Sequence, residues 1–208
     1  MSDPAYEAMC KAKRQNESGN PQGAVKTLED YLSTDPHNVA PRILLANIII
    51  HGLKDESYGL MQLDIVLDLE PENIDAMKAL VSVTSMNKKN NKESDELFNK
   101  IIALEPSGDI YSEYARFLRY QMTDFKRAAE YYEKAIATNP GKFEYHQNYS
   151  VLLLNDLKDW PKAKQELEIL LEMRPGDLMI RKNYDKLMSE KFDRNGNPKV
   201  SLLKRLKH

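Results

Sequence analysis

Residues 111–140 read YSEYARFLRYQMTDFKRAAEYYEKAIATNP, and this stretch determines the fold. Its first half has apolar or small side chains at i, i+3, i+4 and i+7, on one face of a helix: Tyr111, Tyr114, Ala115 and Leu118. After a polar turn at 122–124, the same period returns between Phe125 and Ile136. Pro140 ends the second pattern, because proline has no N–H and restricts the residue before it. The stretch predicts two helices joined by a short turn.

The same pattern repeats along the chain. Five prolines lie at spacings of 35, 35, 34 and 35 residues: Pro36, Pro71, Pro106, Pro140 and Pro175. Seven positions of the fourth unit carry the same or a similar residue 35 positions later. In the fourth unit they are Tyr114, Ala115, Leu118, Asp124, Phe125, Ala128 and Pro140. Their matches in the fifth unit are Tyr149, Ser150, Leu153, Asp159, Trp160, Ala163 and Pro175. A fixed period of this length is the signature of a repeat protein. Each unit therefore reads as one helix pair, and strand signals are nearly absent.

At these residues the chain resembles the tetratricopeptide repeat family. The resemblance rests on an aromatic before the second helix, an alanine early in it and a closing proline. The matching residues are Phe125 and Trp160, then Ala24, Ala128 and Ala163, then the five prolines. The chain departs from the pattern at Gly59 and Ser94, where alanine is expected, and by about one extra residue in the turn between the helices of units four and five. The resemblance covers about Ala5 to Gly176 and implies an all-α, right-handed superhelical solenoid of antiparallel helix pairs.

The domain organisation follows from the repeat. We expect five helix pairs, at about 5–38, 39–73, 74–107, 108–142 and 143–176. Residues 177–191 carry an apolar stripe behind the capping residue Asp177, and a solenoid needs such a helix to cover its last unit. Residues 192–208 are predicted to form a basic C-terminal tail.

Composition narrows the class of protein. The chain has 208 residues, with 30 Lys+Arg against 32 Asp+Glu, so no global charge attracts nucleic acid or membrane. Its 8 glycines disfavour a turn-rich β fold, and a single cysteine, Cys10, excludes an internal disulfide framework. The sequence has neither a signal peptide nor an apolar run of membrane-spanning length. We expect a soluble, cytoplasmic protein without a membrane partner.

Catalytic and metal-binding patterns are not found. The four histidines, His37, His51, His146 and His208, show no metal-binding spacing. The series Asp193, Asn195 and Asn197 echoes a calcium loop but lacks its downstream carboxylate, so a turn is expected there. The sequence therefore predicts no enzyme, no catalytic or metal-ligating residues, no cofactor and no small-molecule substrate.

The resemblance implies instead a protein-interaction scaffold or adaptor, whose first helices line a concave groove that takes an extended peptide or a helix of a partner. Projected onto this chain, the groove residues are Met9, Lys13, Ile43, Asn47, Ile50, His51, Lys78, Ser82, Ser112, Arg116, Arg119, Tyr120, Gln147, Val151 and Asn155. Arg116 and Arg119 are positioned to hold an acidic partner segment through bidentate contacts. The alternative for these two arginines is ordinary ion pairing with Glu113 or Glu144.

The C-terminal tail differs in charge from the rest of the chain. Residues 181–208 contain nine Lys/Arg and three Asp/Glu, a net of +6, which leaves −8 for the remainder because the total is −2. One interpretation is a solvated terminus, or a tail folded onto the acidic body. Another is a contact segment for a protein partner, and a third is electrostatic association with RNA or the ribosome. The contact residues would be Lys199, Leu202, Leu203, Lys204, Arg205, Leu206 and Lys207.

Overall fold

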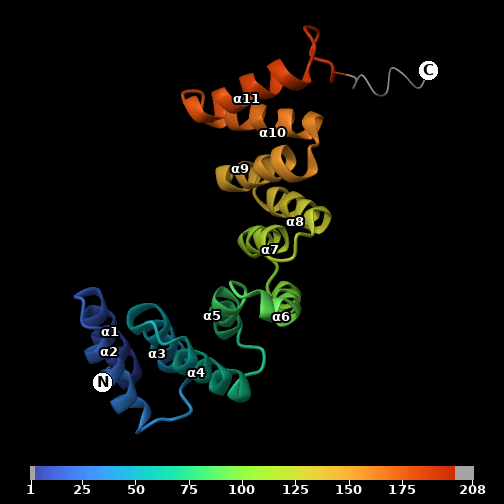
Figure 1. The fold of residues 1–208 in the computed structure, drawn as a ribbon. Helices are drawn as coiled ribbons and strands as arrows, with labels where there is room; N and C mark the ends of the chain where they lie inside the picture. The colour runs from blue at the N-terminus through green and yellow to red at the C-terminus, as the bar shows by residue number, and fades with distance from the viewer. Residues whose placement is uncertain (1–2, 200–208) are drawn as a thin grey trace. The chain divides into compact units, whose positions relative to one another are not determined.

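The computed structural model describes residues 3–199 and consists of α-helical pairs (Figure 1). The pairs are α1 (Pro4–Glu17) with α2 (Pro21–Leu32), α3 (Val39–Ile48) with α4 (Glu56–Leu69), α5 (Ile74–Thr84) with α6 (Asn91–Leu104), α7 (Gly108–Tyr120) with α8 (Phe125–Thr138), and α9 (Phe143–Leu152) with α10 (Trp160–Met173). A further helix, α11 (Leu178–Lys191), packs on α10. The predicted all-α fold of helix pairs is confirmed. Within residues 3–199 the β-type pairing consists of one isolated bridge, between Phe192 and Pro198.

The chain forms two compact units, Met1–Glu105 and Pro106–His208, which we describe separately. The first unit holds pairs one to three, and the second holds pairs four and five with α11. Across residues 3–199, no helix combines the length and the apolar character that crossing a membrane would require.

The helices begin where a short polar side chain binds the exposed N–H groups of the first turn. Asp55, Asp124 and Asp159 cap α4, α8 and α10 by accepting hydrogen bonds from the backbone N–H three residues later. The residue before each of these caps has a left-handed backbone, at Lys54, Thr123 and Lys158. Gly19 and Asn20 play the same two roles before α2, and glycine accepts that conformation without steric cost. This dipeptide therefore sets where the second helix starts in pairs one, two, four and five.

A buried position in each helix sets the register of the pairs. In the first helices this reference position is held, in chain order, by Ala12, Ala46, Val81, Ala115 and Ser150. Its counterparts in the second helices are Ala24, Gly59, Ser94, Ala128 and Ala163. The separation within a pair is 12 residues in pair one and 13 in pairs two to five.

The extra residue predicted for the turns of pairs four and five is thus also present in pairs two and three. In pairs two and five the chain absorbs it as a π-helical turn, at Ile49–Leu53 and Leu153–Leu157. In pair three a short 3-10 turn, Lys88–Asn90, follows α5. A π-helical turn is one residue wider than an α-helical turn, so pairs two and five accommodate the extra residue before the second helix begins.

The two departures from alanine have local causes. A Cβ added at Gly59 would lie 2.3 Å from Cγ1 of Ile50 and 3.1 Å from the carbonyl oxygen of Ala46, so only glycine leaves room for Ile50. Ser94 is fully buried, and its hydroxyl donates to Oγ1 of Thr84 at 3.1 Å. The Thr84 hydroxyl in turn donates to the carbonyl oxygen of Leu80 at 3.1 Å. Both substitutions therefore fit the packing of their own pairs.

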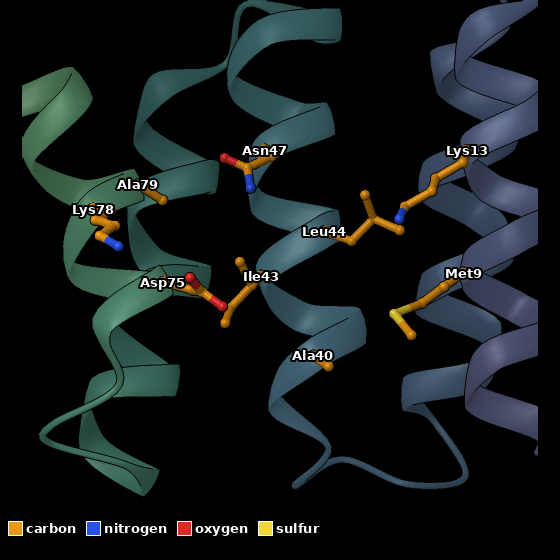
Figure 2. A pocket seen from close by; sticks show the side chains of 9 residues that line it. All are labelled: Met9, Lys13, Ala40, Ile43, Leu44, Asn47, Asp75, Lys78 and Ala79. Carbon is orange, nitrogen blue, oxygen red and sulfur yellow. The ribbon is translucent and has the colours of Figure 1, made fainter. Parts of the chain in front are cut away.

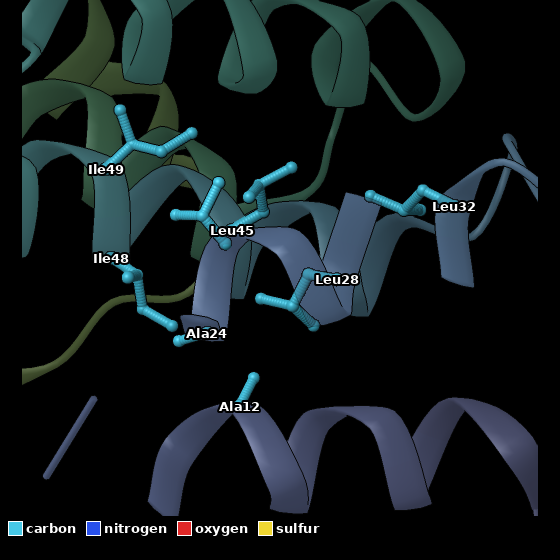
Figure 3. Close-up of a cluster of buried hydrophobic side chains, with 8 residues drawn as sticks. Ala12, Ala24, Leu28, Leu32, Leu45, Ile48 and Ile49 are labelled. Carbon is cyan, nitrogen blue, oxygen red and sulfur yellow. The ribbon is translucent and has the colours of Figure 1, made fainter. Parts of the chain in front are cut away.

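The first unit has an aliphatic core between α1, α2 and α3 (Figure 3). Its members are Ala12, Ala24, Val25, Leu28, Leu32, Leu45, Ile48 and Ile49, and each is at most 8% exposed. Burying a leucine or isoleucine side chain of this kind contributes about 1.5–3 kcal/mol. This core holds α3 against the first pair.

Tyrosine supplies much of the core of the second unit. Tyr114 and Tyr132 are fully buried, and Tyr149 is 3% exposed. The ring of Tyr114 meets Tyr131 edge-on, with 4.5 Å between ring centroids. Ile180 and Leu187 of α11 are buried at the end of this unit, where α11 meets α10.

Candidate functional site

The first unit has a hollow of about 460 Å³ formed by α1, α3 and α5, the first helices of three consecutive pairs (Figure 2). Its lining is Met9, Lys13, Ala40, Ile43, Leu44, Asn47, Asp75, Lys78 and Ala79. Figure 2 shows α3 in the middle, with Ile43, Leu44 and Asn47 pointing into the space between the helices on either side. Met9 and Lys13 enter from α1, and Asp75, Lys78 and Ala79 come from α5.

The register explains why these side chains converge. Positions three before and one after the reference position are four residues apart, so on a helix of 3.6 residues per turn they lie on the same face, one turn apart. Those positions are Met9 and Lys13 in α1, Ile43 and Asn47 in α3, and Lys78 in α5. Because the reference position points into the core of its own pair, the neighbouring face of each first helix lines the hollow.

The hollow combines an apolar floor with a polar rim. Met9, Ile43 and Leu44 are half-buried and supply most of the apolar surface. Lys13 is exposed and makes no ion pair in the described part of the chain. On the opposite side, Nζ of Lys78 lies 2.7 Å from Oε1 of Glu105. One cation at the rim is therefore available to an incoming group, and the other is already paired.

The structure brings together five of the predicted groove residues, Met9, Lys13, Ile43, Asn47 and Lys78. Sequence reasoning missed four lining residues, Ala40, Leu44, Asp75 and Ala79. These four lie two or six positions before the reference position, at the edge of the same helix face. Both positions lie on one side of positions −3 and +1, so widening the predicted face in that direction would have included them.

Other predicted residues of the first unit lie elsewhere. Ile50 is 5% exposed and fills the space that Gly59 leaves, so it offers little surface to a partner. His51 is exposed, on the π-helical turn after α3. Ser82 is also exposed, and its hydroxyl donates to the carbonyl oxygen of Ala79 at 2.7 Å. None of these three lines the hollow.

In the second unit, Arg119 is tied to the protein itself. Its Nε lies 2.6 Å from Oδ2 of Asp156, and its Nη1 donates to the Tyr120 hydroxyl at 2.9 Å. Asp156 lies on the π-helical turn Leu153–Leu157, so the predicted alternative of ion pairing holds for Arg119 with a different carboxylate than Glu113 or Glu144. Tyr120 is 58% exposed beside this pair.

The remaining predicted residues of the second unit differ in how far their side chains are exposed. Arg116, Gln147 and Asn155 are exposed, and Val151 is half-buried. Ser112 is 7% exposed, so it contributes little surface. These residues lie on the first helices α7 and α9 and on the turn after α9.

A buried hydroxyl lies in the same region. The Tyr132 hydroxyl has no hydrogen-bond partner among the described residues, and the charged groups around it include Arg119 and Asp156. Burial raises the pKa of Tyr132 well above the ordinary value for tyrosine. The phenol therefore stays neutral and cannot act as a base at physiological pH.

Most of the predicted tail contact lies outside the described residues: Leu202, Leu203, Lys204, Arg205, Leu206 and Lys207. Lys199 is described, and its backbone N–H donates to the carbonyl oxygen of Lys191 at 2.7 Å. Between residues 3 and 199, no three His, Cys, Asp or Glu side chains come together in a way that could hold a metal ion.

No protein-family model and no curated protein matches the sequence. Among solved structures, MamA from Desulfovibrio magneticus RS-1 (residues 41 to the end) is 20% identical, with a TM-score of 0.72 over 85% of this chain and 99% of MamA. A tetratricopeptide repeat protein from Parabacteroides merdae is 14% identical, with a TM-score of 0.73 over 90% of this chain and 73% of its own. YrrB, described as a TPR protein with an unusual peptide-binding site, is 19% identical, with a TM-score of 0.65 over 81% and 86% of the two chains.

Proposed function

We propose that this chain, which has the tetratricopeptide-repeat fold, is a non-enzymatic scaffold that binds a segment of a partner protein in the hollow between α1, α3 and α5. The observation that carries the proposal is the hollow itself, where three first helices converge on an apolar floor beside an unpaired lysine. The peptide-binding site described for YrrB supports the same class of ligand. The expected compartment is the cytoplasm, where Cys10 would stay reduced.

The lining defines what the partner segment should present. An apolar side chain would cover Ile43 and Leu44, and a carboxylate would bind the free ammonium of Lys13. The Asn47 side chain offers both a donor and an acceptor, which matches the two hydrogen-bonding groups of a peptide unit. The volume of about 460 Å³ falls in the range of sites that hold a ligand by a few anchoring groups.

A charge reversal at Lys13 tests the proposal. Peptides selected from a random library against the whole protein would be labelled, and their dissociation constants measured by fluorescence anisotropy. We expect Lys13→Glu to weaken binding about tenfold, since an ion pair at a partly desolvated site is lost and a repulsion replaces it. Lys26→Glu is the matched control, because Lys26 is an exposed lysine on α2 outside the hollow. Equal affinities of both variants and the unaltered protein would contradict the assignment of the hollow.

A second variant tests the apolar floor separately. Ile43→Asp should abolish detectable binding of the selected peptides, because it puts a charge where the apolar side chain of the ligand would lie. The exposed Arg116, in the second unit, provides a comparison for ligands that carry acidic residues. If Arg116→Glu weakened binding as much as Lys13→Glu, the assignment of the ligand to the hollow would be contradicted.

A further inference from the structure

The fifth pair contains a buried histidine with acceptors at both ring nitrogens. His146 of α9 is 3% exposed. Its Nδ1 lies 2.7 Å from Oε2 of Glu166 in α10, and its Nε2 lies 2.9 Å from the carbonyl oxygen of Pro140. Pro140 is the closing residue of pair four, so this side chain joins two neighbouring pairs.

The geometry fixes the number of protons that the pair holds. A carbonyl oxygen can only accept, so Nε2 of His146 must carry a proton. A distance of 2.7 Å between Nδ1 and a carboxyl oxygen requires a second proton between them, on one atom or the other. The folded pair therefore holds two protons and has no net charge, whether the form is imidazolium with carboxylate or imidazole with carboxylic acid.

The second pair uses the same positions for groups that do not titrate. Arg42 and His146 both lie four residues before the reference position, and Gln62 and Glu166 both lie three residues after its counterpart. Nη1 of Arg42 donates to Oε1 of Gln62 at 2.7 Å, and its Nη2 donates to the carbonyl oxygen of Pro36. Arginine stays charged at every pH that a protein survives, and glutamine stays neutral. The molecule thus carries a titratable and a non-titratable version of one interaction.

The surroundings of Glu166 favour its protonated form. Burial raises the pKa of Glu166, and the nearby carboxylate of Glu133 raises it further. Its hydrogen bond with His146 and the positive charge of Lys162 act in the opposite direction. The neighbouring titratable groups are Glu133 from α8, Tyr149 from α9 itself and Lys162 from α10, which with Glu166 line a crevice of about 270 Å³. Glu133 and Lys162 are paired at 2.8 Å and largely offset each other.

We propose that the His146–Glu166 pair is a pH-sensitive latch that joins α9 and α10 to the end of pair four and loosens as the pH rises. The latch is closed while two protons are present. When one proton leaves, one of the two ring nitrogens of His146 has no hydrogen to donate. That nitrogen then faces either the Glu166 carboxylate or the Pro140 carbonyl oxygen, and the hydrogen bond becomes a repulsion. The proposal is independent of ligand binding in the first unit.

The sign of the pH dependence follows from counting protons. Histidine and glutamate in an unfolded chain have pKa values of about 6.5 and 4.3, so above about pH 6.5 the unfolded pair holds one proton. The folded pair still holds two, so unfolding releases a proton, and the opening equilibrium constant rises up to about tenfold per pH unit. Below about pH 4.3 the unfolded pair holds three protons, and stability falls again. The latch is strongest between these two values.

Native-state hydrogen exchange tests the latch in the whole protein, with rates corrected for the intrinsic pH dependence of exchange. We expect the opening constants of α9 and α10 amides to rise about tenfold between pH 6.5 and 7.5 relative to those of α3 and α4. The latter helices carry the Arg42–Gln62 version and serve as the control within the same molecule. A parallel change in both regions would overturn the proposal.

Two variants separate the latch from a merely structural contact. Glu166→Gln should remove the rise above pH 6.5, because a glutamine amide can donate to Nδ1 of neutral imidazole without an extra proton. The double variant His146→Arg with Glu166→Gln copies the second pair and should make α9 and α10 behave as α3 and α4 do. If either variant fails to fold, the exchange comparison of α9 and α10 with α3 and α4 in the unaltered protein decides. A rise of the α9 and α10 opening constants above pH 6.5 that persists in Glu166→Gln would refute the latch.

Discussion

Ile50 and Arg119 occupy the same place in the repeat, four residues after the reference position of a first helix, yet they do opposite things. Ile50 turns inward and fills the gap at Gly59 within its own pair. Arg119, whose pair has Ala128 in place of that glycine, reaches to Asp156 on the turn of the following pair. Ile50 therefore packs within its own pair, and Arg119 links two neighbouring pairs.

The comparison separates surfaces that are available to a partner from surfaces that the protein uses itself. Neither Ile50 nor Arg119 is free, although the repeat predicts both as groove residues. Lys13 and Asn47, one position after the reference, line a hollow instead. In this chain the position within the helix, and the residue that packs behind it, decide whether a first-helix side chain is available for binding.

The largest difference is expected between two ion pairs, Arg119–Asp156 in the second unit and Lys78–Glu105 in the first. Arg119→Ala leaves Asp156, whose side chain is 23% exposed, without its cation, and should destabilise the second unit by about 2 kcal/mol. Lys78→Ala breaks the pair with Glu105, whose partners are 38% and 52% exposed, and should cost less than about 1 kcal/mol. Urea unfolding followed by hydrogen exchange in each unit measures both. Similar losses of stability in the two variants would contradict the expected difference between the two ion pairs.

A smaller effect is expected at Gly59. Gly59→Ala gains about 1 kcal/mol of helix propensity but forces Ile50 to move, at a cost of about 1–3 kcal/mol, so we expect a net loss of about 1 kcal/mol. In an Ile50→Ala background the clash with Ile50 is gone, and Gly59→Ala should become neutral or stabilising. The coupling is obtained from the four unfolding free energies of the double-mutant cycle. Additive effects would show that Gly59 does not make room for Ile50.

The smallest effect is expected at the hydroxyls of two buried tyrosines, Tyr132 and Tyr149. Tyr132→Phe removes a hydroxyl without a hydrogen-bond partner among the described residues and should leave stability unchanged or raise it by up to about 1 kcal/mol. Tyr149→Phe is the matched variant, because the Tyr149 hydroxyl donates to Oε1 of Glu133 at 2.6 Å. It should destabilise by about 1 kcal/mol. Thermal unfolding of the two variants distinguishes them, and a loss at Tyr132 equal to that at Tyr149 would indicate a partner for the Tyr132 hydroxyl.

The helix pairs could be predicted because their signals are local. The prolines, the capping dipeptides such as Thr123 with Asp124 and the buried alanines all act within one pair, so a single period reveals them. Met9, Lys13, Ile43, Asn47 and Lys78 were found for the same reason, since they repeat on one face of successive first helices.

Contacts between neighbouring pairs could not be predicted, because they depend on how the turns are shaped. The π-helical turn that places Asp156 against Arg119 leaves no clear mark in the sequence. The His146–Glu166 contact was missed although a signal exists: its 20-residue separation equals that of Arg42 and Gln62, in the same register. Comparing polar residues at matching repeat positions, instead of searching for metal spacing, would have found it.

Methyl-resolved NMR of the whole protein tests the central claim, that a partner segment binds between α1, α3 and α5. The measurement follows methyl signals while a selected peptide is added. We predict shifts of the Ala40, Ile43, Leu44 and Ala79 signals, with those of Ile136 and Ala137 in the second unit unchanged. Shifts confined to residues 106–199 would contradict the account.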